Sequence, residues 1–151
     1  MFITELIEDP EFFLTQALVV TFSICCHEYA HARAALWQGD STAADAGHLT
    51  LNPLRQMGVV SLVMFLFIGI AWGAVPVNRS KMRHKWSDAL VSFAGPFANL
   101  VLFLAFGTAF AFSKTRGWGV AAELLFSTGA LANFVLFVLN MMPVPSFDGW
   151  G

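Results

Sequence analysis

Two histidines and a glutamate lie in one apolar stretch of the chain, in the order His27-Glu28-Tyr29-Ala30-His31. On an α-helix, residues four apart share a face, so both imidazoles can bind one zinc ion while Glu28, about 100° round the helix, reaches a zinc-bound water. This spacing predicts a zinc site that can activate water and hydrolyse a peptide bond. The alternative is a pair of histidines that only hydrogen-bond neighbouring helices.

A third ligand is expected, because a catalytic zinc usually has three protein ligands and one open position for water. Asp148 is the best candidate for this role. Pro143 and Pro145 should end the apolar segment before it, and Gly149 allows the backbone to turn so that the carboxylate faces the metal. The alternative is a plain Asp-Gly turn. We therefore expect one zinc per chain.

The composition is that of an integral membrane protein. Of the 151 residues, 57% are hydrophobic and only 12% are charged, which is far more apolar than a soluble domain of this size. The net charge is −2, and no long basic tract is present, so no nucleic-acid partner is expected. Cys25 and Cys26 are adjacent and cannot form a CxxC site. The expected surroundings are a lipid bilayer.

Apolar segments of about the length of a bilayer-spanning helix recur along the chain. The second is the shortest and is interrupted by Gly69 and Gly73. No repeat or soluble domain is visible, so residues 1–151 are expected to form a single all-α polytopic membrane domain. The expected segments are Phe12–Trp37, Val59–Val75, Ala89–Phe112 and Val120–Met142.

The proposed ligands constrain the topology. His27 and Asp148 both lie toward the C-terminal side of their segments, so they can meet only if the first and last segments run in the same direction. One of the two middle segments should then fail to span, and the short second segment is the better candidate for a re-entrant or surface element. This predicts three spanning helices around the zinc site and one shorter membrane segment.

Basic residues indicate which side faces the cytoplasm. Residues 39–87 contain five Lys or Arg, whereas the loop after the third segment contains only Lys114 and Arg116. The positive-inside rule therefore places residues 39–87, and the active site with them, toward the cytoplasm. The acidic N-terminus lacks the positive region of a signal peptide, so the first segment is expected to remain in the mature protein.

Further motifs carry a family resemblance. The histidine–glutamate motif, Ala94-Gly95-Pro96-Phe97-Ala98-Asn99 and the NxxPxPxxDG motif at residues 140–149 together resemble the site-2 protease family of intramembrane zinc metalloproteases. The resemblance implies that His27, His31 and Asp148 bind zinc and that Glu28 is the catalytic base. It also implies substrates that are transmembrane proteins or leftover signal peptides. A compact single membrane domain suits a prokaryotic cell membrane as the location.

The chain also departs from this family. The stretch Gly47–Pro53 is similar to a loop of bacterial members, but Gln56-Met57-Gly58 stands where many of them have a His-apolar-Asp triplet. Family members usually continue beyond the Asp-Gly pair, whereas this sequence stops at Gly151. A natural minimal form and a truncated form are both open.

Supporting roles are expected for a few other residues. Asn140 and Asn99 are candidates to hydrogen-bond the substrate backbone or to fix a ligand, with plain interhelical hydrogen bonding as the alternative. Gly95 is expected to allow close helix packing rather than to touch substrate. His48 lies in the loop after the first segment, where it either approaches the site or stays at the surface.

A substrate helix hides its peptide bonds in intrahelical hydrogen bonds, so it must be presented in extended form. An exposed backbone edge near the site, from the loop Ala46–Pro53 or the start of the second segment, could pair with it. Two other functions remain open from the residues alone. A catalytically inactive zinc-binding protein that sequesters clients would not need Glu28, and a zinc transporter would need ligands strung across the membrane.

Overall fold

The computed structural model describes residues 2–143 and residue 148. Three of its helices are long and apolar enough to cross a membrane: α2 (Pro10–Trp37), α6 (Ser87–Arg116) and α7 (Val120–Asn140). The described residues contain no β-strand. The predicted all-α class, with three spanning helices and one shorter apolar helix, is confirmed. The short elements are η1 (Phe2–Thr4), α1 (Glu5–Glu8), α3 (Thr42–Asp45), α4 (Pro53–Gln56), α5 (Gly58–Ile68) and η2 (Arg79–Lys81).

Helix α2 begins two residues before the predicted boundary because its first turn is well capped. Pro10 occupies the first turn, where its missing N–H is no loss, and the Asp9 carboxylate accepts a hydrogen bond from the Phe12 amide. Before α2 the chain folds back on itself, and the Phe2 ring packs against Phe13 of α2 and Phe65 of α5. The N-terminal end of α2 is thereby joined to the end of α5.

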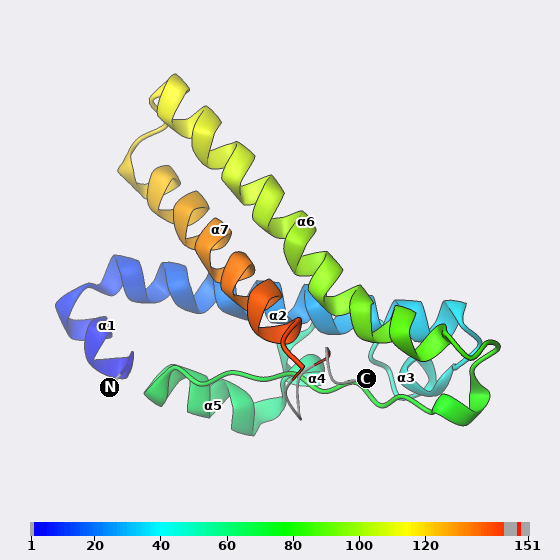
Figure 1. Cartoon of the computed structure of the whole chain (residues 1–151). Helices are drawn as coiled ribbons and strands as arrows, with labels where there is room; N and C mark the ends of the chain where they lie inside the picture. Colours follow the sequence, from blue (N-terminus) through cyan, green and yellow to red (C-terminus); the bar gives the residue numbers. More distant parts are fainter. Residues whose placement is uncertain (1, 144–147, 149–151) are drawn as a thin grey trace.

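Helices α6 and α7 form a hairpin that rises diagonally from α2 (Figure 1). Gly117, in the left-handed conformation at φ 62°, ends α6, and Lys114 pairs with Glu123 across the turn at 3.3 Å. Further along, Gly129 lets α7 approach α6 so closely that a Cβ at this position would overlap the Phe106 ring. In this view α6 starts beside the C-terminal end of α2, and α7 descends toward the middle of α2 (Figure 1).

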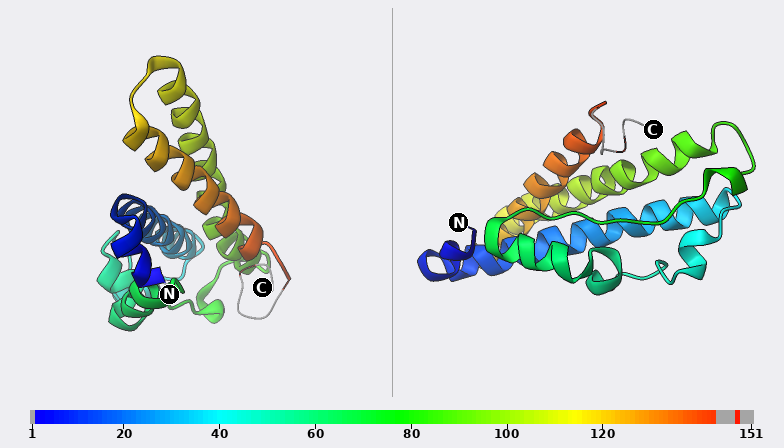
Figure 2. Two further views of the ribbon diagram at one scale, coloured as in Figure 1. Left: turned by 90° about the vertical axis from the view of Figure 1, so that its left-hand side faces the viewer. Right: turned by 90° about the horizontal axis from the view of Figure 1, so that it is seen from below.

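The second apolar segment does not form one long helix. Helix α5 ends at Ile68 because Gly69 adopts a left-handed conformation at φ 82°, and the chain then returns in extended form. This return is fastened to α5 by the Ser61 hydroxyl, which bonds both the N–H and the carbonyl of Trp72, and to α4 by a hydrogen bond from the Ala74 amide to the Gln56 carbonyl. The result is a hairpin of a helix and an extended segment that runs alongside α2 (Figure 2).

A buried carboxylate anchors the far end of the extended segment. Asp40, just beyond α2, is fully buried and accepts hydrogen bonds from the amide and hydroxyl of Thr42 and from the amide of Asn78 at 2.6 Å. Burial alone would raise the pKa of this carboxyl, but these hydrogen bonds and the nearby Lys81 hold it below its ordinary value. Residues 70–78 are thus fixed at both ends beside α2.

Candidate metal centre

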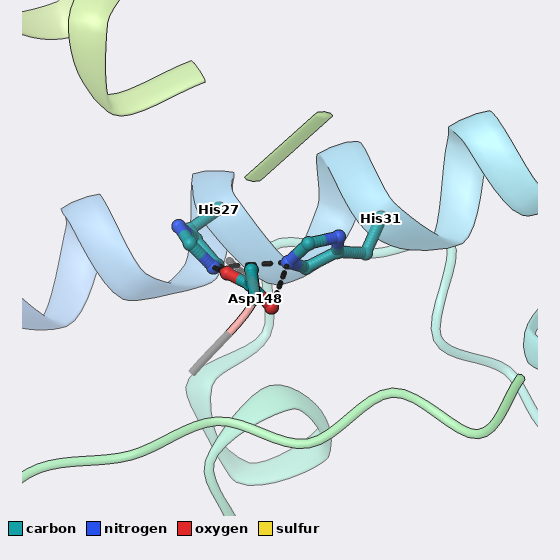
Figure 3. Close-up of side chains that lie close together, drawn as sticks. All are labelled: His27, His31 and Asp148. Atoms are coloured by element: carbon teal, nitrogen blue, oxygen red, sulfur yellow. Dashed lines mark hydrogen bonds and ion pairs between the residues drawn. The ribbon is translucent and has the colours of Figure 1, made fainter. Parts of the chain in front are cut away.

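Three side chains from two distant parts of the sequence lie together at the middle of α2. The Nε2 atoms of His27 and His31 lie 3.0 Å apart. The Asp148 carboxylate lies against both, with Oδ2 2.9 Å from Nε2 of His27 and Oδ1 3.2 Å from Nε2 of His31 (Figure 3). One ligand atom from each residue lies within 4.8 Å of the others. The side chains that the sequence analysis grouped as ligands are therefore neighbours in space.

The outer nitrogen of each imidazole faces an oxygen atom. His31 Nδ1 lies 2.7 Å from the Val91 carbonyl oxygen, and His27 Nδ1 lies 2.5 Å from Oδ1 of Asn99. A carbonyl oxygen can only accept a hydrogen bond, so Nδ1 carries the proton and Nε2 presents its lone pair to the centre. This is the arrangement in which outer hydrogen bonds orient metal-binding histidines.

The donor set and the space between its members fit a zinc ion. Two imidazole nitrogens and a carboxylate are ligands that zinc binds in hydrolytic sites. Asp148 Oδ2 is buried and accepts no hydrogen bond from the described residues. In addition, a Cβ built on Gly95 would overlap the Nε2 atoms of both His27 and His31, so the glycine leaves open a space beside both lone pairs. The residues present could therefore hold one zinc.

Glu28 lies beside this centre, in a cavity of about 430 Å³. Its side chain is buried, at 8% exposure, and the extended segment crosses directly over it. A Cβ at Gly73 would overlap the Glu28 carboxyl group, so the close approach of this segment requires a glycine. The cavity is lined by the metal-centre residues, by Ala71–Val75 of the extended segment, and by Ile24, Val77, Arg79, Asp88, Val91, Ser92, Leu136, Leu139 and Asn140.

The other expected site residues occupy different positions. Asn99 bonds His27 directly, and Gly95 packs against both imidazoles, as expected for a close helix contact. Asn140 lines the cavity, although its amide also donates to the Leu136 carbonyl of its own helix. His48 does not line the cavity and instead lies 3.4 Å from Oε1 of Gln56.

Two residues that the sequence analysis did not single out as site residues shape the cavity. Gly73, noted only as a break in an apolar run, covers Glu28. Gln56, noted only as a departure from a family pattern, is buried. Its side-chain amide donates to the backbone carbonyls of His48 and Thr50, and its backbone carbonyl accepts a hydrogen bond from the Ala74 amide. Through Gln56, the loop Ala46–Pro53 is therefore linked to the extended segment beside the site.

The chain is similar to bacterial proteins named as zinc metalloproteases. It is 36% identical over 148 residues to "Putative zinc metalloprotease YwhC" of Bacillus subtilis, which covers 91% of this chain and 66% of that protein. It is 37% identical over 140 residues to "Putative zinc metalloprotease Rip2" of Mycolicibacterium smegmatis, covering 85% of this chain and 52% of the relative. The Rip2 protein of Mycobacterium tuberculosis is 32% identical over 138 residues, with 51% of its length covered.

The chain thus spans between about half and two thirds of the length of these relatives. No family model matches the sequence, and no solved structure matches it. The region of similarity covers 85% to 91% of this chain, which is long enough to include most of its helices. Together with the donor set on α2, these relatives support membership of a zinc metalloprotease family.

Proposed function

We propose that this chain is an intramembrane zinc endopeptidase of the site-2 type, which hydrolyses peptide bonds within transmembrane segments of membrane proteins. One observation carries the proposal. The two histidines of the motif lie within an apolar helix long enough to span a membrane, and Asp148 meets them from beyond the end of another such helix. A soluble metalloprotease has no need to bury its centre among spanning helices.

In this proposal His27, His31 and Asp148 hold one Zn²⁺. When bound, zinc supplies a Lewis acid and lowers the pKa of a coordinated water toward about 7. The chain itself supplies the ligand orientation, since Asn99 and the Val91 carbonyl hold the two imidazoles with Nε2 inward.

Glu28 acts as the general base and acid. Its carboxylate faces the cavity that contains the metal centre, where it can take a proton from the attacking water and return it to the departing amine. No hydrogen bond from another described side chain occupies it, so its oxygens can bind water. A carboxylate at the middle of a spanning helix costs about 2.5 to 3.5 kcal/mol, and a hydrated cavity reduces this cost.

The extended segment gives a surface for an unwound substrate. Residues 70–78 run along the cavity, so a peptide could lie beside them in extended form with its scissile carbonyl near Glu28. Asn140 also lines the cavity and is placed to hydrogen-bond a substrate backbone. Substrates of this class are transmembrane proteins and leftover signal peptides.

The proposed location is a prokaryotic cell membrane, with the active site toward the cytoplasm. The relatives come from Bacillus and from mycobacteria. The loop that joins the extended segment to α6 contains Arg79, Lys81, Arg83 and Lys85, and it is fastened to the C-terminal end of α2 through the Gln38 carbonyl and Asp40. The basic residues therefore gather at the end of α2 that follows the motif, as the positive-inside rule requires.

The test compares wild type with Glu28→Gln, measuring bound zinc and the cleavage of a model transmembrane substrate together. We expect both proteins to bind one zinc, and the variant to lose about 10²- to 10⁴-fold in cleavage rate. If both bind zinc and neither cleaves, a zinc-binding protein that sequesters clients becomes the better explanation. A wild type that binds no zinc would overturn the metal centre itself.

A further inference from the structure

The hydrogen bond between His27 and Asn99 is the first of a chain that crosses the interface of all three long helices. Asn99 Nδ2 on α6 lies 3.0 Å from Oδ1 of Asn133 on α7. Asn133 Nδ2 lies 2.8 Å from the hydroxyl oxygen of Ser23, one turn before His27 on α2. Ser23, Asn99 and Asn133 are all fully buried. Polar side chains so deep among apolar helices are costly unless they are fully paired.

A backbone carbonyl fixes the donor-to-acceptor direction of these hydrogen bonds. Asn133 Nδ2 also lies 2.9 Å from the carbonyl oxygen of Gly129, which can only accept a hydrogen bond. The atom of Asn133 at this position must therefore be the amide nitrogen, and Oδ1 must point toward Asn99. It follows that Asn99 presents its nitrogen to Asn133 and its oxygen to His27. His27 Nδ1 must then be the donor of its own hydrogen bond.

Among these hydrogen bonds, only the one to Asn133 specifies the orientation of the Asn99 amide. An asparagine can present either an NH₂ group or an oxygen to a neighbour of this kind. A flipped Asn99 would donate to Nδ1 of His27, and the imidazole would then keep its proton on Nε2, where the metal needs a lone pair. His31 does not share this ambiguity, because the Val91 carbonyl orients it directly.

We propose that Asn133 is a positioning residue for the metal centre: through Asn99 it holds His27 in the tautomer protonated at Nδ1, so that Nε2 is free to bind the metal. The inference rests on the proposed zinc site, but it concerns the imidazole itself and not the cleavage of substrate. Helix α7 then contributes to the metal centre in two ways, because it carries Asn133 and precedes Asp148 in the sequence.

The first experiment measures the tautomers in the metal-free wild-type protein. The protein is labelled with ¹⁵N-histidine in detergent, and long-range ¹H–¹⁵N spectra are recorded about two pH units above the ordinary histidine pKa of about 6.5. We expect His27 and His31 both to carry their proton on Nδ1. A wild-type His27 protonated on Nε2, or present as a mixture, would overturn the proposal without reference to any variant.

The second experiment replaces Asn133 by leucine, which has a similar size but no amide. We expect His27 to become a mixture of tautomers while His31 stays unchanged, and zinc affinity, measured by competition with a chelator, to fall about 10- to 100-fold. Ser23→Ala leaves the Gly129 carbonyl in place, so it should preserve the tautomer and most of the affinity. If Asn133→Leu keeps the wild-type tautomer, or alters both histidines alike, Asn133 has no specific positioning role.

Two controls separate positioning from general packing. Ser127→Ala, on α7 but outside the chain of hydrogen bonds, removes only a local bond to the Leu124 carbonyl and should leave both readouts unchanged. In an Asn99→Leu background, Asn133→Leu should cause little further loss of zinc affinity, because its effect passes through Asn99. Additive losses would overturn the proposal. A wild type that binds zinc but cleaves nothing would contradict only the proposed function, since neither readout requires cleavage.

Discussion

The Nε2 atoms of His27 and His31 lie 3.0 Å apart, and the Asp148 carboxylate contacts both of them. Both imidazoles direct Nδ1 toward an oxygen, so two lone pairs face each other across this distance, with the Asp148 carboxylate beside them. Such an arrangement is unfavourable by itself, because lone pairs and a carboxylate repel one another. A cation between them converts the repulsion into three ligand bonds.

Zinc is therefore expected to stabilise the folded chain. At free zinc about 100-fold above its dissociation constant, binding to the folded state alone contributes about 2.7 kcal/mol, which for a chain of this size raises the unfolding temperature by about 5 to 10 °C. Thermal unfolding in detergent, followed by circular dichroism at a series of zinc concentrations, measures this rise. His31→Ala should abolish it, whereas His84→Ala, at an exposed position away from the centre, should retain it. An equal rise in both variants would place the zinc elsewhere.

Gly95→Ala should close the metal centre. The added methyl group would occupy the space beside Nε2 of both histidines, so we expect zinc affinity to fall by at least about 10- to 100-fold. Competition with a chelator measures this loss. Gly107→Ala is the matched control on the same helix, because a Cβ there meets nothing within 4 Å. That control should bind zinc normally and gain up to about 1 kcal/mol in helix stability.

Gly73→Ala should separate zinc binding from catalysis. Its methyl group would displace the Glu28 carboxyl group, whose atoms are the nearest to a Cβ at this position, ahead of any metal ligand. We expect zinc content to stay at the wild-type level and cleavage of a transmembrane substrate to fall about 10²-fold, since a misplacement of about 1 Å costs this much. Normal cleavage by Gly73→Ala would show that the extended segment does not fix the position of Glu28.

The three long helices could be predicted from the sequence because each is a long apolar run with clear ends. Pro10 and Asp9 begin α2, and α7 ends at Asn140, just before Pro143. The second apolar run was only partly predictable. Hydropathy continues through Val75, but the helix stops at Ile68, and an apolar run does not by itself distinguish helix from extended chain. The predicted turn at Gly149 lies outside the described residues.

The motif spacing predicted which side chains could share a metal, because His27 and His31 are fixed on one helical face. It did not assign an outer partner to either histidine, although Asn99 was already a candidate to fix a ligand. Asn99 lies 72 residues from His27 in sequence and Val91 lies 60 residues from His31, and no local periodicity encodes such pairs. The role of Gly73 could not be predicted either, because it depends on how the extended segment crosses α2. These contacts follow from tertiary packing alone.

The last prediction concerns Asp40, which fastens the extended segment to the end of α2. In Asp40→Asn, an NH₂ group must face either the Thr42 or the Asn78 amide, so we expect a loss of about 1 to 3 kcal/mol at neutral pH, measured by thermal unfolding. Because the folded-state pKa of Asp40 lies below its ordinary value of 3.8, its stabilising effect is present above that value and is lost as the pH falls through the lower, folded-state pKa. The difference between wild type and variant should therefore shrink under acid conditions. Asp45→Asn, at an exposed position, should change stability by less than about 0.5 kcal/mol. Equal unfolding temperatures for Asp40→Asn and wild type at neutral pH would show that this carboxylate does not hold the segment in place.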